Sequence, residues 1–180
     1  INYNPLATVD DGSCCYSSFG SVWNQIGQDI DGEAAGDRSG YSVSLNDIGD
    51  VVVIGAYTHD GVNGSYSGQV RIYQNVTGYW IQLGQDIDGE AGSDNFGHSV
   101  SLNSYGDKVA IGAIGNDGNG SYSGHVRIYN WDGTSWIQLG QDIDGEAGGN
   151  SSGWSVSLSA DGNTVAIGAP GNDDNGYASG

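Results

Sequence analysis

The chain has no methionine, only two prolines and two cysteines, and only four lysines and arginines among its 180 residues. Four cationic side chains cannot neutralise a track of phosphates, which argues against a nucleic-acid partner. The same deficit argues against docking on an anionic membrane surface. No apolar run approaches the roughly 20 residues that a membrane-spanning helix needs, so we expect no membrane insertion. Because the chain starts at Ile1 and contains no methionine, we expect any targeting segment to lie upstream or to have been removed.

Acidic and small residues dominate the composition instead. The 22 aspartates and glutamates give a formal net charge of −18, and 33 glycines indicate a chain rich in turns. Five tryptophans, eleven tyrosines and repeated valine and isoleucine runs supply enough apolar surface for a packed core. The chain is therefore not a disordered acidic tail, and its composition favours β-structure.

An internal repeat organises the sequence. The octet GQDIDGEA occurs three times without change, starting at Gly27, Gly84 and Gly140, at spacings of 57 and 56 residues. Each unit contains four short strand signals separated by turns, with no 3.6-residue periodicity. Four strands in about 56 residues are typical of a propeller blade. We therefore predict an all-β fold, a segment of a β-propeller with four-stranded antiparallel blades.

The repeat also sets the expected domain boundaries. We predict the end of a cysteine-containing repeat or linker at residues 1–16 and a propeller segment at 17–180. Because propellers close with roughly four to eight blades, we expect the remaining blades of a longer chain to cover the open sheet edges. A ring closed by three copies of the segment is the alternative. The segment is expected to hold the last strand of one blade at 21–30, full blades at about 40–87 and 96–143, and half a blade at 153–180.

Several segments resemble known repeats. FGHSVSL…GDKVAIGA (96–113), GWSVSLSADGNTVAIGAP (153–170) and GYSVSL…GDVVVIGA (40–56) resemble FG-GAP repeats, the blades of integrin-α-type and of many secreted bacterial and algal propellers. INYNPLATVDDGSC (1–14) is similar to the end of a short cysteine-bounded repeat of marine bacterial surface proteins. In that repeat the cysteine of DGSC, here Cys14, is expected to pair with an upstream cysteine. Both resemblances imply a secreted or cell-surface protein.

Acidic motifs are the candidate metal sites. FG-GAP blades often bind calcium between their first two strands, but the equivalent turns here hold few acids and are interpreted as hairpin turns. The sequence DIDGE is richer, because an extended strand places its two aspartates on one face, roughly 7 Å apart. Its three carboxylates could converge on calcium, and the alternative is a solvated loop between blades. The candidate ligands are Asp29, Asp31, Glu33, Asp86, Asp88, Glu90, Asp142, Asp144 and Glu146.

A glycan site is a second possibility. The loops between the second and third strands of each unit alternate Asn or Asp with Gly, and loop tips on one rim of a propeller commonly bind ligands. Asn and Gly are also ordinary turn residues. Trp80 and its two equivalents are expected to pack blade against blade, whereas Trp131 lies in a turn and is the better candidate for an exposed sugar-stacking ring. The candidate ligand-binding residues are Trp131, Asn116, Asp117 and Asn119.

No catalytic constellation emerges from the sequence. The three histidines do not recur at one blade position, and neither a GxSxG nor an HExxH motif is present. Arg71 and Arg127 repeat at one strand position, where we expect them to pair with carboxylates. The sequence favours a non-enzymatic extracellular interaction or adhesion module whose partner is a protein or a glycan. The alternatives are a glycan-binding propeller and an accessory domain of a secreted hydrolase.

Overall fold

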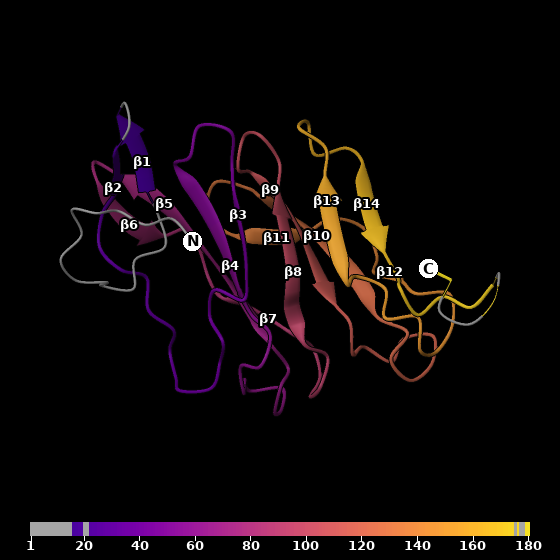
Figure 1. Cartoon of the computed structure of the whole chain (residues 1–180). Helices are drawn as coiled ribbons and strands as arrows, with labels where there is room; N and C mark the ends of the chain where they lie inside the picture. The colour runs from indigo at the N-terminus through magenta and orange to yellow at the C-terminus, as the bar shows by residue number, and fades with distance from the viewer. Residues whose placement is uncertain (1–15, 20–21, 175, 177–178) are drawn as a thin grey trace.

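A computed structural model describes residues 16–19, 22–174, 176 and 179–180 (Figure 1). The predicted cysteine repeat lies outside the described residues, apart from Tyr16. The described residues contain no helix long and apolar enough to cross a membrane. Their strands are β1 (Tyr16–Phe19), β2 (Val22–Gln25), β3 (Ser42–Leu45), β4 (Val51–Ala56), β5 (Gln69–Val76), β6 (Tyr79–Gln82), β7 (Ile87–Asp88), β8 (Phe96–Leu102), β9 (Lys108–Ala113), β10 (His125–Trp131), β11 (Trp136–Gln138), β12 (Ile143–Asp144), β13 (Ser155–Leu158) and β14 (Val165–Gly168).

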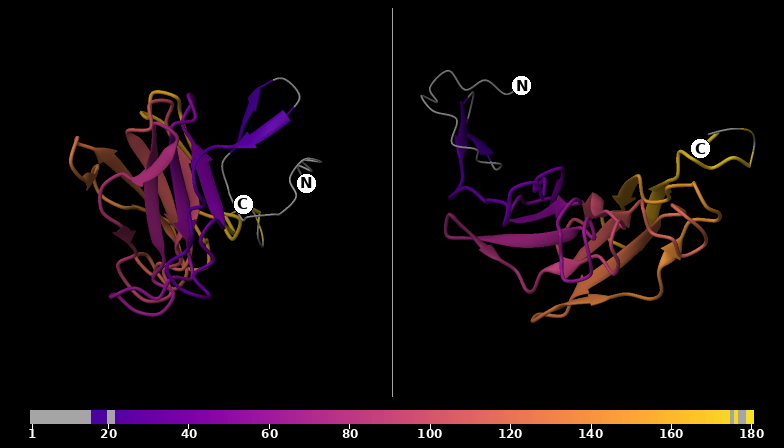
Figure 2. Two further views of the ribbon diagram at one scale, coloured as in Figure 1. Left: turned by 90° about the vertical axis from the view of Figure 1, so that its left-hand side faces the viewer. Right: turned by 90° about the horizontal axis from the view of Figure 1, so that it is seen from below.

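Two sheets repeat the same antiparallel topology. Strands β3-β4-β5-β6 form the first full blade, in which β7 also pairs with β5. Strands β8-β9-β10-β11 form the second full blade, in which β12 also pairs with β10. Strands β13 and β14 form a half blade, and the sheets follow one another along an arc (Figure 2). The predicted fold, a propeller segment with four-stranded antiparallel blades, is confirmed.

The fourth strand of each blade differs from the prediction. The sequence predicts one strand over 79–87, but the structure divides it into β6 and β7, and it divides the equivalent segment of the second blade into β11 and β12. The glycine that opens each octet causes the break, because Gly84 has a φ of 83° and Gly140 has a φ of 74°. These left-handed backbone conformations do not continue a strand.

The N-terminal end of the described chain adds a strand that the sequence analysis did not predict. Strand β1 pairs with β2 in the register Tyr16 to Gln25, and β5 pairs with β6 in the register Tyr73 to Gln82. Because Gln25 and Gln82 are equivalent in the repeat, β1 corresponds to the outer half of a third strand. The hairpin β1–β2 is therefore the counterpart of the third and fourth strands of a blade.

The main core lies between the two full blades. All six residues of β4 are buried, as expected for an apolar strand covered on both faces. The side chains of Val53, Val70 and Phe96 are fully buried in one cluster that also takes in residues of β9 and β10. Burying each such side chain contributes roughly 1.5 to 3 kcal/mol, so blade-to-blade packing is a large part of the stability.

Glycines of the repeated motifs let adjacent blades approach closely. A Cβ on Gly55, in the IGA motif of the first blade, would lie 2.2 Å from the carbonyl oxygen of Gly97 in the next blade. The hydroxyl of Ser42 donates a 2.7 Å hydrogen bond to the same carbonyl oxygen. The second blade repeats the arrangement with Gly112, Ser99 and the carbonyl oxygen of Gly153, at 2.2 Å and 2.7 Å. The repeated glycine and serine thus form a close, hydrogen-bonded contact between adjacent blades.

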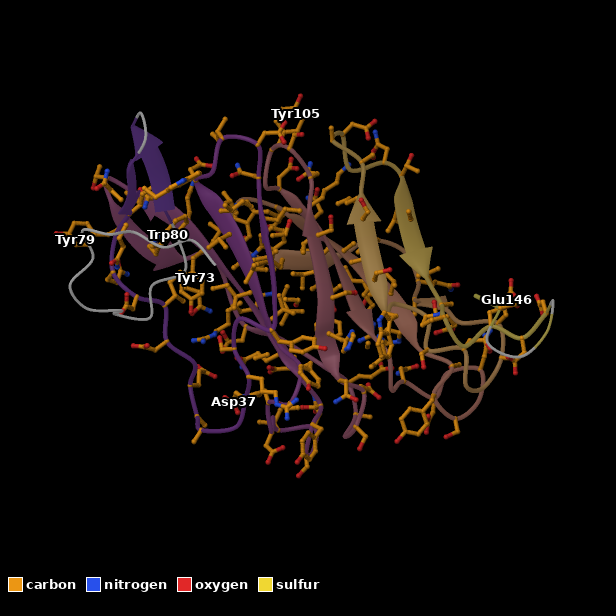
Figure 3. The ribbon with its side chains drawn as sticks, in the orientation of Figure 1. Asp37, Tyr73, Tyr79, Trp80, Tyr105 and Glu146 are labelled. Atoms are coloured by element: carbon orange, nitrogen blue, oxygen red, sulfur yellow. The ribbon has the colours of Figure 1, made fainter. Side chains whose placement is uncertain are left out.

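The turns between the first two strands of the full blades are closed by side-chain hydrogen bonds. The Asn103 side chain accepts hydrogen bonds from the backbone nitrogens of Asp107 and Lys108 and donates one to the Asp107 carboxylate, at 3.1, 3.0 and 2.7 Å. Asn46 makes the same three bonds in the first blade. The aspartates at the ends of these two turns, Asp50 and Asp107, therefore stabilise the turns. Tyr105 marks this rim of the segment, whereas Asp37 and Glu146 lie at the opposite rim with the octet loops (Figure 3).

Candidate functional site: the acidic clusters between blades

Each octet connects one blade to the next, and its first two residues contact the fourth strand of the following blade. A Cβ on Gly84 would lie 2.5 Å from the Trp131 ring, so only a glycine fits there. The Gln85 side chain donates a 3.0 Å hydrogen bond to the carbonyl oxygen of Trp136. The indole of Trp136, which is 2% exposed, donates to the carbonyl oxygen of Leu83 at 2.8 Å. Trp80 is held by the preceding octet in the same way, so these two tryptophans pack between blades as predicted.

The three carboxylates of one DIDGE motif have three different hydrogen-bond donors. The Gln82 side chain donates to Asp86 at 2.7 Å, and the Gln69 side chain donates to Asp88 at 3.3 Å. Glu90 accepts a 2.9 Å bond from the Asn116 side chain. The carboxylates of one motif therefore share no donor.

Carboxylates of two successive motifs do converge, and Arg127 of β10 joins them. Its Nε donates to Oδ1 of Asp142 at 2.7 Å and its Nη2 donates to Oδ2 of the same residue at 2.6 Å. Its Nη2 also donates to Oε2 of Glu90, from the preceding motif. The Arg127 side chain is only 11% exposed. We name Glu90, Asp94, Asn116, His125, Arg127 and Asp142 the second-blade cluster.

The first blade contains an equivalent cluster. Arg71 donates to the carbonyl oxygen of Asp31 at 2.7 Å and lies 3.9 Å from the Glu33 carboxylate. The Gln69 side chain donates to Glu33 at 3.1 Å. The predicted pairing of both repeated arginines with acidic residues is thus seen in both blades, with closer contacts around Arg127.

Several other acids of the motifs have separate contacts. Asp29 accepts a 3.1 Å bond from Gln25, four residues earlier, as Asp86 does from Gln82. Asp144 is exposed and lies in β12 opposite His125. Glu146 lies 3.5 Å from the amide of Asn172 in the half blade. The nine predicted ligands are therefore distributed over successive blade junctions.

Charge pairing sets the protonation of the second-blade cluster. The hydrogen bond from Arg127 lowers the pKa of Asp142. Burial raises the pKa of Glu90, but the hydrogen bond and charge of Arg127 outweigh burial, so this pKa is also lowered. Burial, followed by the charge of Arg127, lowers the pKa of His125. Burial raises the pKa of the third carboxylate, that of Asp94. At neutral pH the carboxylates of Glu90 and Asp142 are therefore ionised beside a neutral imidazole.

These shifts predict that the protein loses stability as the solution is acidified. The unfolded carboxylates titrate near pH 4 and an unfolded histidine near 6.5. Since Glu90, Asp142 and His125 all have lowered folded-state pKa values, the unfolded chain binds more protons at these three groups below these pH values, whereas the raised pKa of Asp94 opposes them at one carboxylate. We expect the free energy of unfolding, measured by urea titration, to fall as pH decreases from 7 to 4. His125→Gln should flatten the part of the profile between pH 5 and 6.5, and an unchanged profile would contradict the assignment.

Among the residues that the structure describes, His125 finds no hydrogen-bond partner for either ring nitrogen, although it is only 1% exposed. Its Nδ1 lies 3.8 Å from Oδ2 of Asp142. The equivalent residue of the first blade is Gln69, whose amide lies within 3.4 Å of Glu33, Asp88 and His59. The histidine thus replaces a well-bonded side chain with an unbonded one. The sequence analysis missed this residue because the three histidines do not share a repeat position.

The predicted glycan-binding residues do not come together. Trp131 and the 116–119 loop lie near opposite ends of β10, about 20 Å apart for a seven-residue strand. Trp131 is half-buried and its ring lies 5.5 Å from that of Trp136. Asn116 is buried in the second-blade cluster, while Asp117 and Asn119 are exposed on the loop. Trp131 is therefore part of the packing between blades.

A cleft of about 440 Å³ opens at the free edge of β14. In the full blades the third strand occupies the equivalent place. Among the described residues, β14 pairs only with β13, so Asp144 and Glu146 of the third octet remain open to solvent there. The cleft is lined by residues that include Asp144, Glu146, Asn150, Ser152, Asn172 and Asp174.

Two exposed tyrosines on the octet rim were also missed by sequence reasoning. Tyr66 is 52% exposed with a φ of 57°, and Tyr122 is 56% exposed with a φ of 55°. The backbone N–H of each tyrosine donates a hydrogen bond to an aspartate of the same loop. Tyr66 donates to Asp60 at 2.9 Å, and Tyr122 donates to Asp117 at 2.8 Å. Left-handed backbone is uncommon for a bulky residue, and no sequence pattern marks it here.

Comparison with known proteins agrees with the fold and the repeat. The family model of the FG-GAP repeat matches residues 30–73 and 87–129. These two matches cover most of the first full blade with its preceding octet, and the same part of the second. A comparison with curated proteins found none that matches. The chain therefore carries two FG-GAP repeats within a propeller-type fold.

Proposed function

We propose that this chain is part of a non-enzymatic extracellular interaction module that binds a protein or a glycan through the octet rim of its blades. The observation that carries the proposal is the repeated presentation of Tyr66 and Tyr122. Both rings are exposed, and both residues adopt a backbone conformation that costs an L-residue about 1 kcal/mol or more. Such strain, repeated in two blades, favours a role that an ordinary turn residue would not fill.

The loops that present these tyrosines are held in place by the neighbouring octets. The Asn63 side chain donates a 2.7 Å hydrogen bond to the carbonyl oxygen of Gly89, and Asn119 donates a 3.0 Å bond to that of Gly145. Backbone bonds from Ser93 to Ser65 join the same two segments at 2.8 Å. A fixed aromatic ring loses little entropy on binding, and tyrosine is enriched in protein interfaces.

An array that carries both glycans and secreted proteins tests the proposal. We expect the wild-type chain to bind at least one ligand, and Tyr66→Asn/Tyr122→Asn to weaken that binding at least tenfold. Asparagine tolerates positive φ, so the double variant should keep the wild-type free energy of unfolding within about 0.5 kcal/mol. Tyr105→Asn is the matched control, because Tyr105 is 76% exposed on the opposite rim and should not affect binding.

The outcomes separate the candidate functions. Binding confined to glycans supports the lectin alternative, and binding to proteins supports the interaction module. Recovery of the bound ligand unchanged, measured by mass spectrometry, supports a non-enzymatic role, whereas cleavage contradicts it. The proposal is overturned if the wild-type chain binds no ligand on the array, or if the double tyrosine variant binds as well as the wild type.

A further inference from the structure

We propose that Glu90, His125 and Asp142 form a site for a divalent transition-metal ion of the Zn²⁺ type at the junction between the two full blades. One oxygen of each carboxylate and one ring nitrogen lie within 4.8 Å of one another. Imidazole with carboxylate is a donor set that suits Zn²⁺, whereas Ca²⁺ takes oxygen ligands. The inference does not depend on the proposed binding role of the octet rim.

The unpartnered ring of His125 is the first argument. An unsatisfied polar atom that is buried from solvent is destabilising, and such groups are rare in native proteins. Both ring nitrogens of His125 are of this kind, whereas Gln69 at the same position of the first blade is well bonded. A metal ion on Nδ1, which faces Asp142, gives one of the two buried ring nitrogens the partner it lacks.

The second argument is how the two carboxylates are held. Asn116 donates to Oε1 of Glu90 at 2.9 Å, and Gln138 donates to Oδ1 of Asp142 at 2.7 Å. The other oxygens, Oε2 and Oδ2, are bridged by a single donor, Nη2 of Arg127. Hydrogen bonds to the outer oxygens orient carboxylates for metal binding, as in known metal sites.

Binding of the ion to these two oxygens therefore requires Arg127 to give up the hydrogen bonds of its Nη2. A metal ion on Oε2 and Oδ2 displaces Nη2 only, and Arg127 keeps its 2.7 Å bond from Nε to Oδ1 of Asp142. The negative charges of Glu90, Asp94 and Asp142 all act on His125, and those of Glu90 and Asp142 also act on Arg127. Three carboxylates against one guanidinium leave an excess of two negative charges, which a divalent ion neutralises.

Titration of the chain with Zn²⁺ alone, followed by calorimetry, tests the proposal. Cys14→Ser/Cys15→Ser should be present throughout, because thiolates also bind zinc. We expect one Zn²⁺ per chain, and His125→Gln should weaken binding at least tenfold. The first blade tolerates glutamine at this position, so the variant should fold. His59→Asn, which copies Asn116 of the second blade, is the matched control and should bind Zn²⁺ as the parent does.

A spectroscopic measurement keeps the test independent of the variants. The nitrogen resonances of the His125 ring should shift on addition of Zn²⁺ and stay unchanged with Ca²⁺ at the same concentration. The absence of zinc binding to the parent chain, unchanged binding in His125→Gln, or an unmoved His125 ring in the presence of bound zinc would each overturn the proposal.

Discussion

Gly112→Ala is expected to destabilise the protein by about 3 kcal/mol, at the upper end of the cost of overpacking a core. A Cβ at this position would lie 2.2 Å from the carbonyl oxygen of Gly153 and 2.5 Å from the hydroxyl oxygen of Ser99. The carbonyl belongs to the backbone of the next blade, so the clash is relieved only if the blades move apart. That movement would also break the 2.7 Å hydrogen bond from Ser99 to Gly153. Urea-induced unfolding measures the loss.

Gly168→Ala provides the matched control for this prediction. Gly168 occupies the same place in the third IGA motif, but in the described part of the chain no backbone atom of another blade lies near its Cβ position. The nearest atom is the hydroxyl oxygen of Ser155, at 2.4 Å, which a rotamer change can move. We expect a cost below about 1 kcal/mol. Equal losses of stability in the two variants would contradict the close contact between blades inferred at Gly112.

Arg127→Met is expected to cost about 2 to 4 kcal/mol, because it leaves Glu90 and Asp142 without their shared cation. The estimate is below that for a fully buried pair, since the two carboxylate side chains are 45% and 26% exposed. The pKa values of both acids should rise towards their ordinary range. The loss of stability between pH 5 and 3 should therefore be shallower than in the wild type. Chemical denaturation at pH 7, pH 5 and pH 3 measures both effects.

Arg71→Met is the matched comparison in the first blade. Arg71 bonds a backbone carbonyl at 2.7 Å and lies 3.9 Å from Glu33, so it neutralises one distant carboxylate. We expect its removal to cost at least about 1 kcal/mol less than that of Arg127. If Arg71→Met cost as much as Arg127→Met, the convergence of two octets on Arg127 would not explain the stability.

The sequence predicted the blades because their signals are local. The period of the octet, the apolar run 51–56 and the turn residues together indicate four short strands per unit. Breaks in the fourth strand were not predicted, because glycine adopts extended and left-handed conformations about equally readily, so the sequence does not fix which one it takes. Gly84 and Gly140 are both left-handed, although the Cβ position of Gly84 meets the Trp131 ring of the next blade and no described atom lies near that of Gly140.

The site was predicted less well than the fold, for a related reason. DIDGE was identified as the acidic motif, but its carboxylates were grouped by proximity in sequence. Blade stacking instead brings Glu90 of one motif to Asp142 of the next, across 52 residues. The repeated arginines gave the only sequence signal for this arrangement. His125 gave none, because histidine replaces glutamine in one copy alone.

A double-mutant cycle between Glu90→Gln and Arg127→Met, measured in EDTA, tests most directly that successive octets are joined through one arginine. If Arg127 bridges the two motifs, the four unfolding free energies should give a coupling energy between about 1 and 3 kcal/mol. The cycle with Asp86→Gln in place of Glu90→Gln should give a coupling near zero, because Asp86 accepts its hydrogen bond from Gln82 rather than from Arg127. Additive effects of Glu90→Gln and Arg127→Met would contradict the account.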